Sequence, residues 1–321
     1  MSFRLRIGSR PSPLALAQAN LIKGLIEAAL PGLIAEIVAV STSGDKLTTA
    51  SLAQIGGKGL FIRELEQALA AGQIDIAVHS MKDLPAVLPS EFRLAAVPQR
   101  ENPRDALITR AGGGWNQLRH GARLGTSSTR RRLEALRLRP DLAVMPLRGN
   151  VDTRLARLAA GDFDAIILAI AGLRRLGKLG ACEFTELDVR EFVPSGGQGA
   201  LAIEALAAGP IAGAQEIDAA LAALNDAHAL AEVAAERAFL ATIGASCVSP
   251  VGVKASVDGA TLKLNALLFS VDGSRNLAGE IAVPYRIEDG RDGWAPAAAA
   301  IGATLGRQMI DRGARELIAS A

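Results

Sequence analysis

The chain has 321 residues and a formal net charge of +2; half of its residues are hydrophobic and only 3% are aromatic. This length predicts two or three domains, because single cores rarely grow beyond roughly 250 to 300 residues. Near-neutral charge and scarce aromatic residues argue against nucleic-acid binding. No apolar segment suggests export or membrane insertion, so we expect a cytoplasmic protein without membrane or nucleic-acid partners.

The cysteines and histidines give no metal-binding pattern. Cys182 and Cys247 lack a CxxC partner and nearby histidines, and the three histidines are scattered. Zinc-ligand spacing is therefore absent, and we expect no metal.

The first hundred residues alternate between strand and helix patterns. Ser12 is placed to cap a helix with Pro13 at its first position, and Pro31-Gly32 ends that helix. A polar segment at 41–59 interrupts the alternation. The βαβ order predicts a mostly parallel sheet covered by helices. Strands are predicted at residues 3–8, 34–40 and 73–78, and helices at 13–30 and 60–72.

The pattern restarts after residues 98–103, which are typical of an interdomain hinge with prolines at both ends. Residues 194–199 form a second, glycine-rich crossing. Strands are predicted at residues 105–109, 123–125, 142–146 and 164–169, and helices at 129–138 and 151–160.

The last hundred residues predict a smaller α/β unit. An alanine-rich helical stretch covers 217–243, strand patterns with Asp-Gly turns follow Pro250, and a helix covers 297–319. We therefore expect an α/β fold of three domains, the third containing an antiparallel sheet. The expected domains are residues 1–98 with about 199–216, residues 103–194, and residues 217–321.

Lys82 and Asp83 follow directly after the predicted strand 73–78. The carboxyl edge of a sheet is where open α/β folds usually place their ligand crevice. Both residues are therefore candidates for a site, although they could equally be ordinary residues of a solvated turn.

Four segments place arginine or hydroxyl groups beyond predicted strands or at helix starts. Such helix starts direct backbone N–H groups toward an anion, and arginine adds a planar fork for carboxylates. Arg130 and Arg131, in a first turn, oppose the helix dipole and call for a nearby anion. Each arginine alone could be a solvated surface residue, but four loops of one chemistry favour a shared polyanion. The segments are residues 8–12, 125–132, 147–154 and 172–175.

Nucleotide motifs do not account for this pattern. The segment Gly56-Gly57-Lys58-Gly59 lacks the distal glycine and the Ser/Thr of a P-loop, and no GxGxxG opens the first helix. Several carboxylates are therefore the better expected ligand chemistry.

Sequence blocks along nearly the whole chain, from Arg6 to the last helix, resemble the porphobilinogen deaminase family. The cysteine loop departs slightly, reading Ala245-Ser246-Cys247-Val248 where the family commonly has Gly-Gly-Cys-Gln. The cysteine and proline keep their spacing. The resembling blocks are residues 56–61, 77–83, 125–128 with the following arginines, 147–150 and 247–252.

This resemblance implies two domains similar to the lobes of periplasmic solute-binding proteins, with the active site in the cleft between them. It also implies a covalent dipyrromethane cofactor joined by a thioether to Cys247. Four porphobilinogen units would be added in series, each losing ammonia. Hydrolysis would then release hydroxymethylbilane from a transferase that we expect to be a monomer.

The resemblance also assigns roles to individual residues. Asp83 becomes the catalytic carboxylate at the reacting pyrrole nitrogen. Independently of the resemblance, the polar, glycine-bearing segment 45–59 predicts a lid ending in Lys58 and Phe61, with Asp45 as a secondary contact and an inert surface loop as the alternative. Cys182, within Gly180-Ala181-Cys182-Glu183-Phe184, is expected to be a structural or incidental residue. The expected binding residues for cofactor and substrate carboxylates are Arg10, Ser12, Lys82, Thr126, Ser127, Ser128, Arg130, Arg131, Arg148, Arg154 and Arg175.

Two other functions are compatible with parts of the sequence. A two-lobed anion-binding protein would explain the arginines but not the third domain or Cys247. An RNA-binding protein could use Arg130, Arg131 and Arg132, but it would lack aromatic residues for base stacking.

Overall fold

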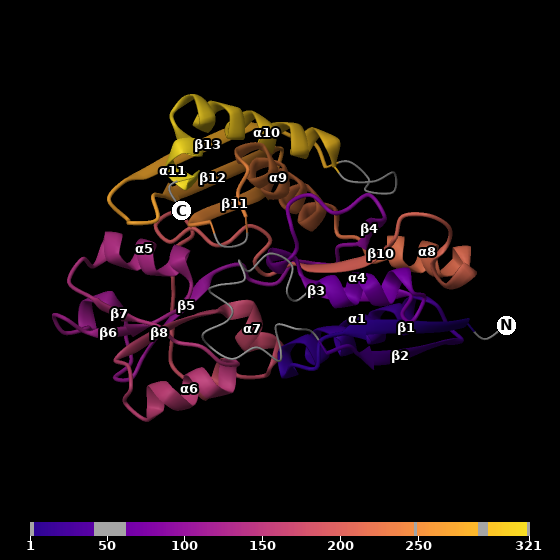
Figure 1. Cartoon of the computed structure of the whole chain (residues 1–321), viewed down its shortest axis with the longest axis horizontal. Helices are drawn as coiled ribbons and strands as arrows, with labels where there is room; N and C mark the ends of the chain where they lie inside the picture. The colour runs from indigo at the N-terminus through magenta and orange to yellow at the C-terminus, as the bar shows by residue number, and fades with distance from the viewer. Residues whose placement is uncertain (1–2, 42–61, 247–248, 288–294, 320–321) are drawn as a thin grey trace.

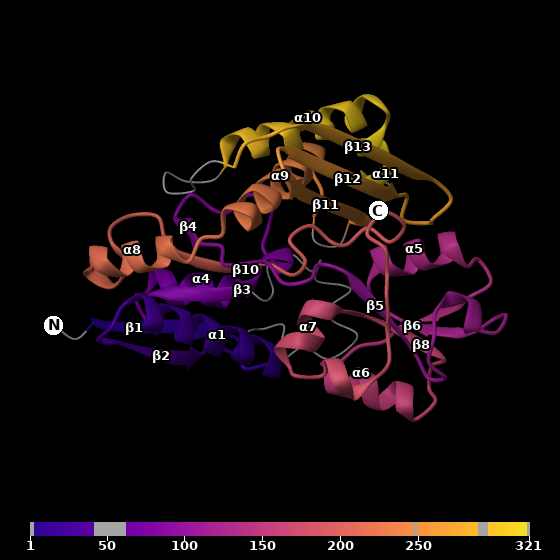
Figure 2. The ribbon, with the colours of Figure 1, turned by 180° about the vertical axis from the view of Figure 1, so that it is seen from behind.

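The computed structural model describes residues 3–41, 62–246, 249–287 and 295–319. They form two α/β lobes and a third domain that lies across both of them (Figure 1). Figure 2 shows the same arrangement from behind, with the third domain above the line where the lobes meet. None of the described helices is long and apolar enough to cross a membrane.

The first lobe is built on a five-stranded sheet of order β2-β1-β3-β10-β4. β1 is parallel to β2 and β3, whereas β10 is antiparallel to β3 and β4. Helices α1 and α8 pack on one face of the sheet and α4 on the other. The elements are β1 (Phe3–Ser9), α1 (Pro13–Ala29), β2 (Leu33–Ala39), α4 (Arg63–Ala70), β3 (Ile76–Ser80), β4 (Phe92–Ala96), β10 (Leu201–Leu206) and α8 (Gln215–Ala223).

The second lobe is also a five-stranded sheet, of order β7-β6-β8-β5-β9. β6 is parallel to β7 and β8, and β5 is antiparallel to β8 and β9. Helices α6 and α7 cover one face and α5 the other. The elements are β5 (Asp105–Thr109), β6 (Arg123–Gly125), α5 (Thr129–Leu138), β7 (Ala143–Met145), α6 (Val151–Ala159), β8 (Ala165–Ala169), α7 (Ile170–Arg175) and β9 (Thr185–Glu186).

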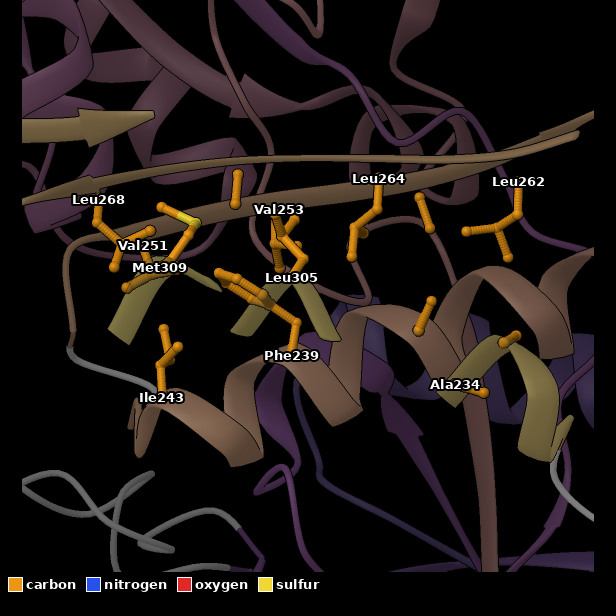
Figure 3. Packing of buried hydrophobic residues seen from close by; sticks show 14 of the residues in the cluster. Ala234, Phe239, Ile243, Val251, Val253, Leu262, Leu264, Leu268, Leu305 and Met309 are labelled. Atoms are coloured by element: carbon orange, nitrogen blue, oxygen red, sulfur yellow. The ribbon is translucent and has the colours of Figure 1, made fainter. Parts of the chain in front are cut away.

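The third domain packs helices on one face of an antiparallel sheet of order β11-β12-β13. Figure 3 shows Phe239 of the long helix lying against Val253 and Leu305 between helix and sheet, and all three are at most 2% exposed. The other face of the sheet contacts the second lobe, where Asn265 Nδ2 donates to the Val189 carbonyl at 3.0 Å. The elements are α9 (Ala227–Ile243), β11 (Val251–Asp258), β12 (Thr261–Phe269), β13 (Asn276–Pro284), α10 (Pro296–Asp311) and α11 (Ala314–Ala319).

Most predicted elements of the lobes are confirmed, and two predicted helices were wrong in extent. The stretch 217–243 divides into α8 and α9, because the Asp226 side chain caps a new helix by accepting from Ala229 N. The stretch 297–319 divides at Gly313, whose φ of +90° ends α10. The sequence did not predict β4, β9, β10 or α7. The first sheet is mixed, whereas a mostly parallel sheet was expected.

Two chain segments connect the lobes, and they touch at Gly199. The first crossing segment runs from β4 to β5, and the second crossing segment runs from β9 to β10. Glu101 N donates to the Gly199 carbonyl at 3.2 Å. A Cβ at Gly199 would lie 2.2 Å from the Glu101 carbonyl oxygen, and the φ of +89° disfavours any other residue. The junction between the lobes therefore requires glycine at this position.

We predict that Gly199→Ala lowers the free energy of unfolding by about 2 to 4 kcal/mol, since it adds a backbone clash to left-handed strain. The matched control is Gly209→Ala, where φ is +76° but nothing lies within 4 Å of the added Cβ. That variant should lose only about 1 kcal/mol. Chemical denaturation measures both, and equal losses would show that the close approach is unimportant.

Candidate active site

Lys82 and Asp83 lie in a single 3-10 turn, Met81–Asp83, at the carboxyl end of β3. They line a cavity of about 730 Å³ between the first lobe and the third domain, together with Arg237 of α9. Asp83 is exposed, and its carboxylate makes no hydrogen bond or ion pair with another residue in the described part of the chain. It is therefore available to a ligand.

Asp83 also borders a second cavity, which it shares with Arg10 and Ser12. These three residues, with His79, line this smaller adjoining cavity of about 70 Å³. Ser12 Oγ accepts from Ala15 N at 3.3 Å, so this hydroxyl caps α1, as predicted. His79 is buried and lies 3.0 Å from Glu204 Oε2.

Arg130 and Arg131 converge on one buried carboxylate, Asp105 of β5. Arg130 Nη2 donates to Asp105 Oδ2 and Arg131 Nη2 to Asp105 Oδ1, both at 2.7 Å. Burial alone would raise the pKa of Asp105, but the two guanidiniums outweigh it and hold that pKa well below the usual range. The anion that these first-turn arginines require is thus supplied by the protein itself.

The two arginines differ in which of their side-chain nitrogens lack a hydrogen-bond partner. Arg130 also donates to Glu134 Oε2 at 2.9 Å and to the Val193 carbonyl at 2.8 Å, so both its terminal nitrogens are used. Arg131 keeps a buried Nε without a hydrogen-bond partner. Burial raises the pKa of Glu134 to about 8, against the opposing effect of Arg130. Arg131 also uses both terminal nitrogens, since its Nη1 donates to the Ile167 carbonyl at 3.0 Å, so only the buried Nε distinguishes it from Arg130.

The hydroxyl groups at 126–128 shape the start of α5. Ser128 Oγ accepts from Arg131 N at 3.3 Å and caps the helix. Thr126 Oγ1 accepts from Ser128 N at 3.2 Å, and Ser127 Oγ donates to the Leu147 carbonyl at 3.0 Å. The side chains expected to bind ligand therefore also hold the loop in shape.

The other predicted arginines belong to the second lobe and its junction. Arg148 precedes the Asn150 cap of α6, and Arg154 Nε donates to the Gly149 carbonyl at 2.8 Å. Burial and Arg131 lower the pKa of Arg154. Arg175 Nη2 donates to the Gly199 carbonyl at 2.6 Å, and burial lowers its pKa to about 10. Arg175 thus contacts the crossing segment itself.

Two buried residues of the site were missed from the sequence. Asp105 was read only as the first residue of a strand, and Gln198 only as part of a glycine-rich crossing. Gln198 Oε1 accepts from Lys82 Nζ at 3.2 Å, and Gln198 Nε2 donates to Asp105 Oδ1 at 2.9 Å. The polar side chain within Gly196-Gly197-Gln198-Gly199 was the available signal.

Four predicted site residues lie outside the described residues: Cys247, Asp45, Lys58 and Phe61. The roles given to them stay predictions. The residues on either side of the Cys247 position, Ser246 and Ser249, line the same 730 Å³ cavity as Lys82 and Asp83.

The site suits a ligand with several carboxylates. The pKa of Lys82 is lowered to about 8, first by burial and then by Arg131, while Asp83 and Asp105 oppose the shift. Below that pH the ammonium is charged and needs an anion. The unpartnered Arg131 Nε has the same requirement. Among the described residues, no group of three His, Cys, Asp or Glu side chains is arranged to hold a metal ion.

Comparisons with known proteins cover almost the whole chain. Residues 5–210 match the family model "Porphobilinogen deaminase, dipyromethane cofactor binding domain", and residues 230–311 match "Porphobilinogen deaminase, C-terminal domain". A solved structure of the methionine binding protein MetQ aligns at a TM-score of 0.43 and 11% identity, covering 68% of this chain and 90% of MetQ.

Full-length relatives carry the same name as the family models. The porphobilinogen deaminase of Roseiflexus castenholzii is 43% identical over 316 residues, covering 98% of each chain. That of Chromobacterium violaceum is 44% identical over 317 residues, covering 99% of this chain and 97% of the relative. The chain belongs to the porphobilinogen deaminase family.

Proposed function

We propose that this chain is a hydroxymethylbilane synthase that joins four porphobilinogen units on a covalently held dipyrromethane, losing one ammonia at each addition. The observation that carries the proposal is Asp83, a carboxylate without a protein partner in the described chain, beside Lys82 at the meeting of two cavities. The expected monomeric state and cytoplasmic location remain predictions.

Binding rests on matching charges. Each pyrrole ring carries an acetate and a propionate, so every ring brings two carboxylates to the cleft. Arg131, Arg148 and Arg154 lie at the starts of α5 and α6, where guanidinium forks and helix N-termini both favour carboxylates. Lys82 adds a compact charge on the opposite lobe. Arg10, Arg175 and the hydroxyls at 12 and 126–128 complete the proposed binding set.

Catalysis rests on Asp83. When the C–N bond of porphobilinogen breaks, the electron pair leaves with the nitrogen as ammonia, and a positive charge spreads over the pyrrole ring. A fixed carboxylate near the ring nitrogen stabilises that charge and can hold the nitrogen's proton. Asp83 is suited to this task because its carboxylate is exposed and forms no ion pair with an arginine or lysine among the described residues.

Attachment is assigned to Cys247. A thiolate that attacks an electrophilic methylene gives a thioether, which reducing agents do not cleave. When bound, the dipyrromethane supplies the pyrrole carbon to which the first substrate unit is joined. The position of Ser246 and Ser249 on the cavity that contains Asp83 supports this assignment.

Cys247→Ser should remove the cofactor mass from the purified protein and abolish product formation. The matched control is Cys182→Ser, whose thiol packs in the second lobe and should keep both. Intact-mass spectrometry reads the result. Release of the cofactor by a disulfide reductant would exclude a thioether.

Asp83→Asn should fold and carry cofactor, yet lose about 10²- to 10³-fold in kcat, as when one charge-stabilising group is removed. The control, Asp311→Asn, changes an exposed carboxylate at the far end of α10 and should leave turnover unchanged. Steady-state kinetics with porphobilinogen decides the matter. Near-normal turnover in Asp83→Asn would remove Asp83 from the mechanism.

Arg148→Leu and Arg154→Leu should stall elongation, because the growing chain then lacks partners for its added carboxylates. Mass spectrometry should show enzyme carrying one to three extra units. Arg157→Leu is the control on α6, since Arg157 pairs with Asp162 and a surface pair contributes little. A normal product yield without accumulated intermediates would contradict the binding role.

A further inference from the structure

Gln198 is a buried amide placed between the two lobes. It lies in the second crossing segment and is only 1% exposed. Its Oε1 accepts from Lys82 Nζ at 3.2 Å. Its Nε2 donates to the Pro103 carbonyl at 2.8 Å and to Asp105 Oδ1 at 2.9 Å. One side chain thus joins the first lobe, the first crossing and the second lobe.

The amide can take only one orientation here. The Lys82 ammonium only donates hydrogen bonds, whereas the Asp105 carboxylate and the Pro103 carbonyl only accept them. Reversing the amide would place an NH₂ group against the ammonium and an oxygen against both acceptors. The hydrogen-bond partners therefore fix the direction of Gln198 from both ends.

The backbone around Gln198 is held as closely as the side chain. A Cβ at Gly197 would lie 2.6 Å from Met81 Cγ and 3.0 Å from Lys82 N, so this glycine packs against the turn that carries Lys82. Arg100 Nε donates to the Gln198 carbonyl at 3.0 Å. Gln198 has little freedom to follow Lys82 if Lys82 moves.

A neutral amide has a specific electrostatic consequence at this position. A carboxylate there would pair with the Lys82 ammonium and cancel its charge, and it would repel Asp105. An apolar side chain would leave the ammonium without this acceptor. The amide orients Lys82 while leaving its positive charge available to a ligand.

We propose that Gln198 is a positioning residue that fixes Lys82 of the first lobe relative to the Asp105–Arg131 pair of the second lobe, so that carboxylate-binding groups on both lobes keep one relative placement. The inference rests on the proposed function, since it assumes that Lys82 and Arg131 bind carboxylates. Gln198 acts through Lys82 and need not touch the ligand.

The test compares Gln198→Glu and Gln198→Met in the full chain. Several charged groups set the charge state of Lys82. They are Asp83 on its own turn, Asp105 of β5, and Arg130 and Arg131 of α5. Arg63 and Glu66 of α4 and Arg237 of α9 line the cavity that Lys82 also lines. Against this constant background, Gln198→Glu should raise the pKa of Lys82 by at least about one unit. Gln198→Met should lower it, because the charged form loses an acceptor.

Competitive acetylation with acetic anhydride across pH 6 to 10, read by peptide mass spectrometry, measures the pKa of Lys82 without any need for turnover. The control is Gln99→Met, an exposed glutamine of the first crossing, which should leave that pKa unchanged. If Gln198→Glu does not fold, Gln198→Asn replaces it. Its shorter amide should place the pKa of Lys82 between the values of the wild type and the Met variant.

Kinetics gives the second readout. In Gln198→Met, the high-pH limb of the pH profile of kcat/KM for porphobilinogen should shift to lower pH by the same amount as the pKa of Lys82. The value of kcat/KM at its optimum should fall about tenfold. A Lys82 pKa equal to that of the wild type in every folded variant would overturn the proposal, even if thermal stability fell. Failure of the proposed function would appear differently, as a wild type that does not consume porphobilinogen.

Discussion

The geometry of the candidate site depends on one buried carboxylate, Asp105, which accepts from two guanidiniums and one amide. Arg130 and Arg131 come from the first turn of α5, and Gln198 comes from the crossing between the lobes. Burying these charges is costly, and the site is stable only because each is paired. Removing one partner of such a group typically costs about 3 to 5 kcal/mol, since the other charge stays buried. The carboxylate therefore fixes where α5 begins relative to the lobe junction.

This constraint divides the cations into two groups with different roles. Arg130 and Arg100 are fully committed to protein carboxylates, Arg100 through Glu232 and Glu236. Arg100 thereby links the segment between the lobes to α9 of the third domain, whereas Arg130 joins β5 and α5 within the second lobe. Lys82 donates to Gln198, and Arg131 donates through both terminal nitrogens to Asp105 and the Ile167 carbonyl, which leaves its buried Nε without a partner. A polycarboxylate entering the cleft would thus meet charges that are already in position, with little reorganisation needed.

Local signals in the sequence predicted local structure well. The bounds of β5, β6 and α5 were predicted as the structure has them, because hinge prolines and a Ser128 cap mark them clearly. The break between α8 and α9 was missed because the alanine-rich sequence favours helix on both sides, although Asp226 signalled a cap. The end of α10 at Gly313 was missed in the same way, although glycine commonly follows the last residue of a helix.

What the sequence could not predict is mostly long-range. Residues 199–216 were expected to belong to the first domain, but no local pattern predicted that β10 pairs there with β3, more than a hundred residues earlier in the chain. The shared partner of Arg130 and Arg131 is also outside their local sequence, since Asp105 precedes them by 25 and 26 residues. Motifs therefore predicted the chemistry of the site, whereas the fold determines which cations form ion pairs within the protein.

The most direct test of the account is the intact mass of the wild-type protein before and after brief exposure to limiting porphobilinogen. The purified protein should exceed its sequence mass by one dipyrromethane at the start, and by further pyrrole units, added in steps, after exposure. Each added unit should have lost one ammonia. An unmodified mass in both samples would contradict it.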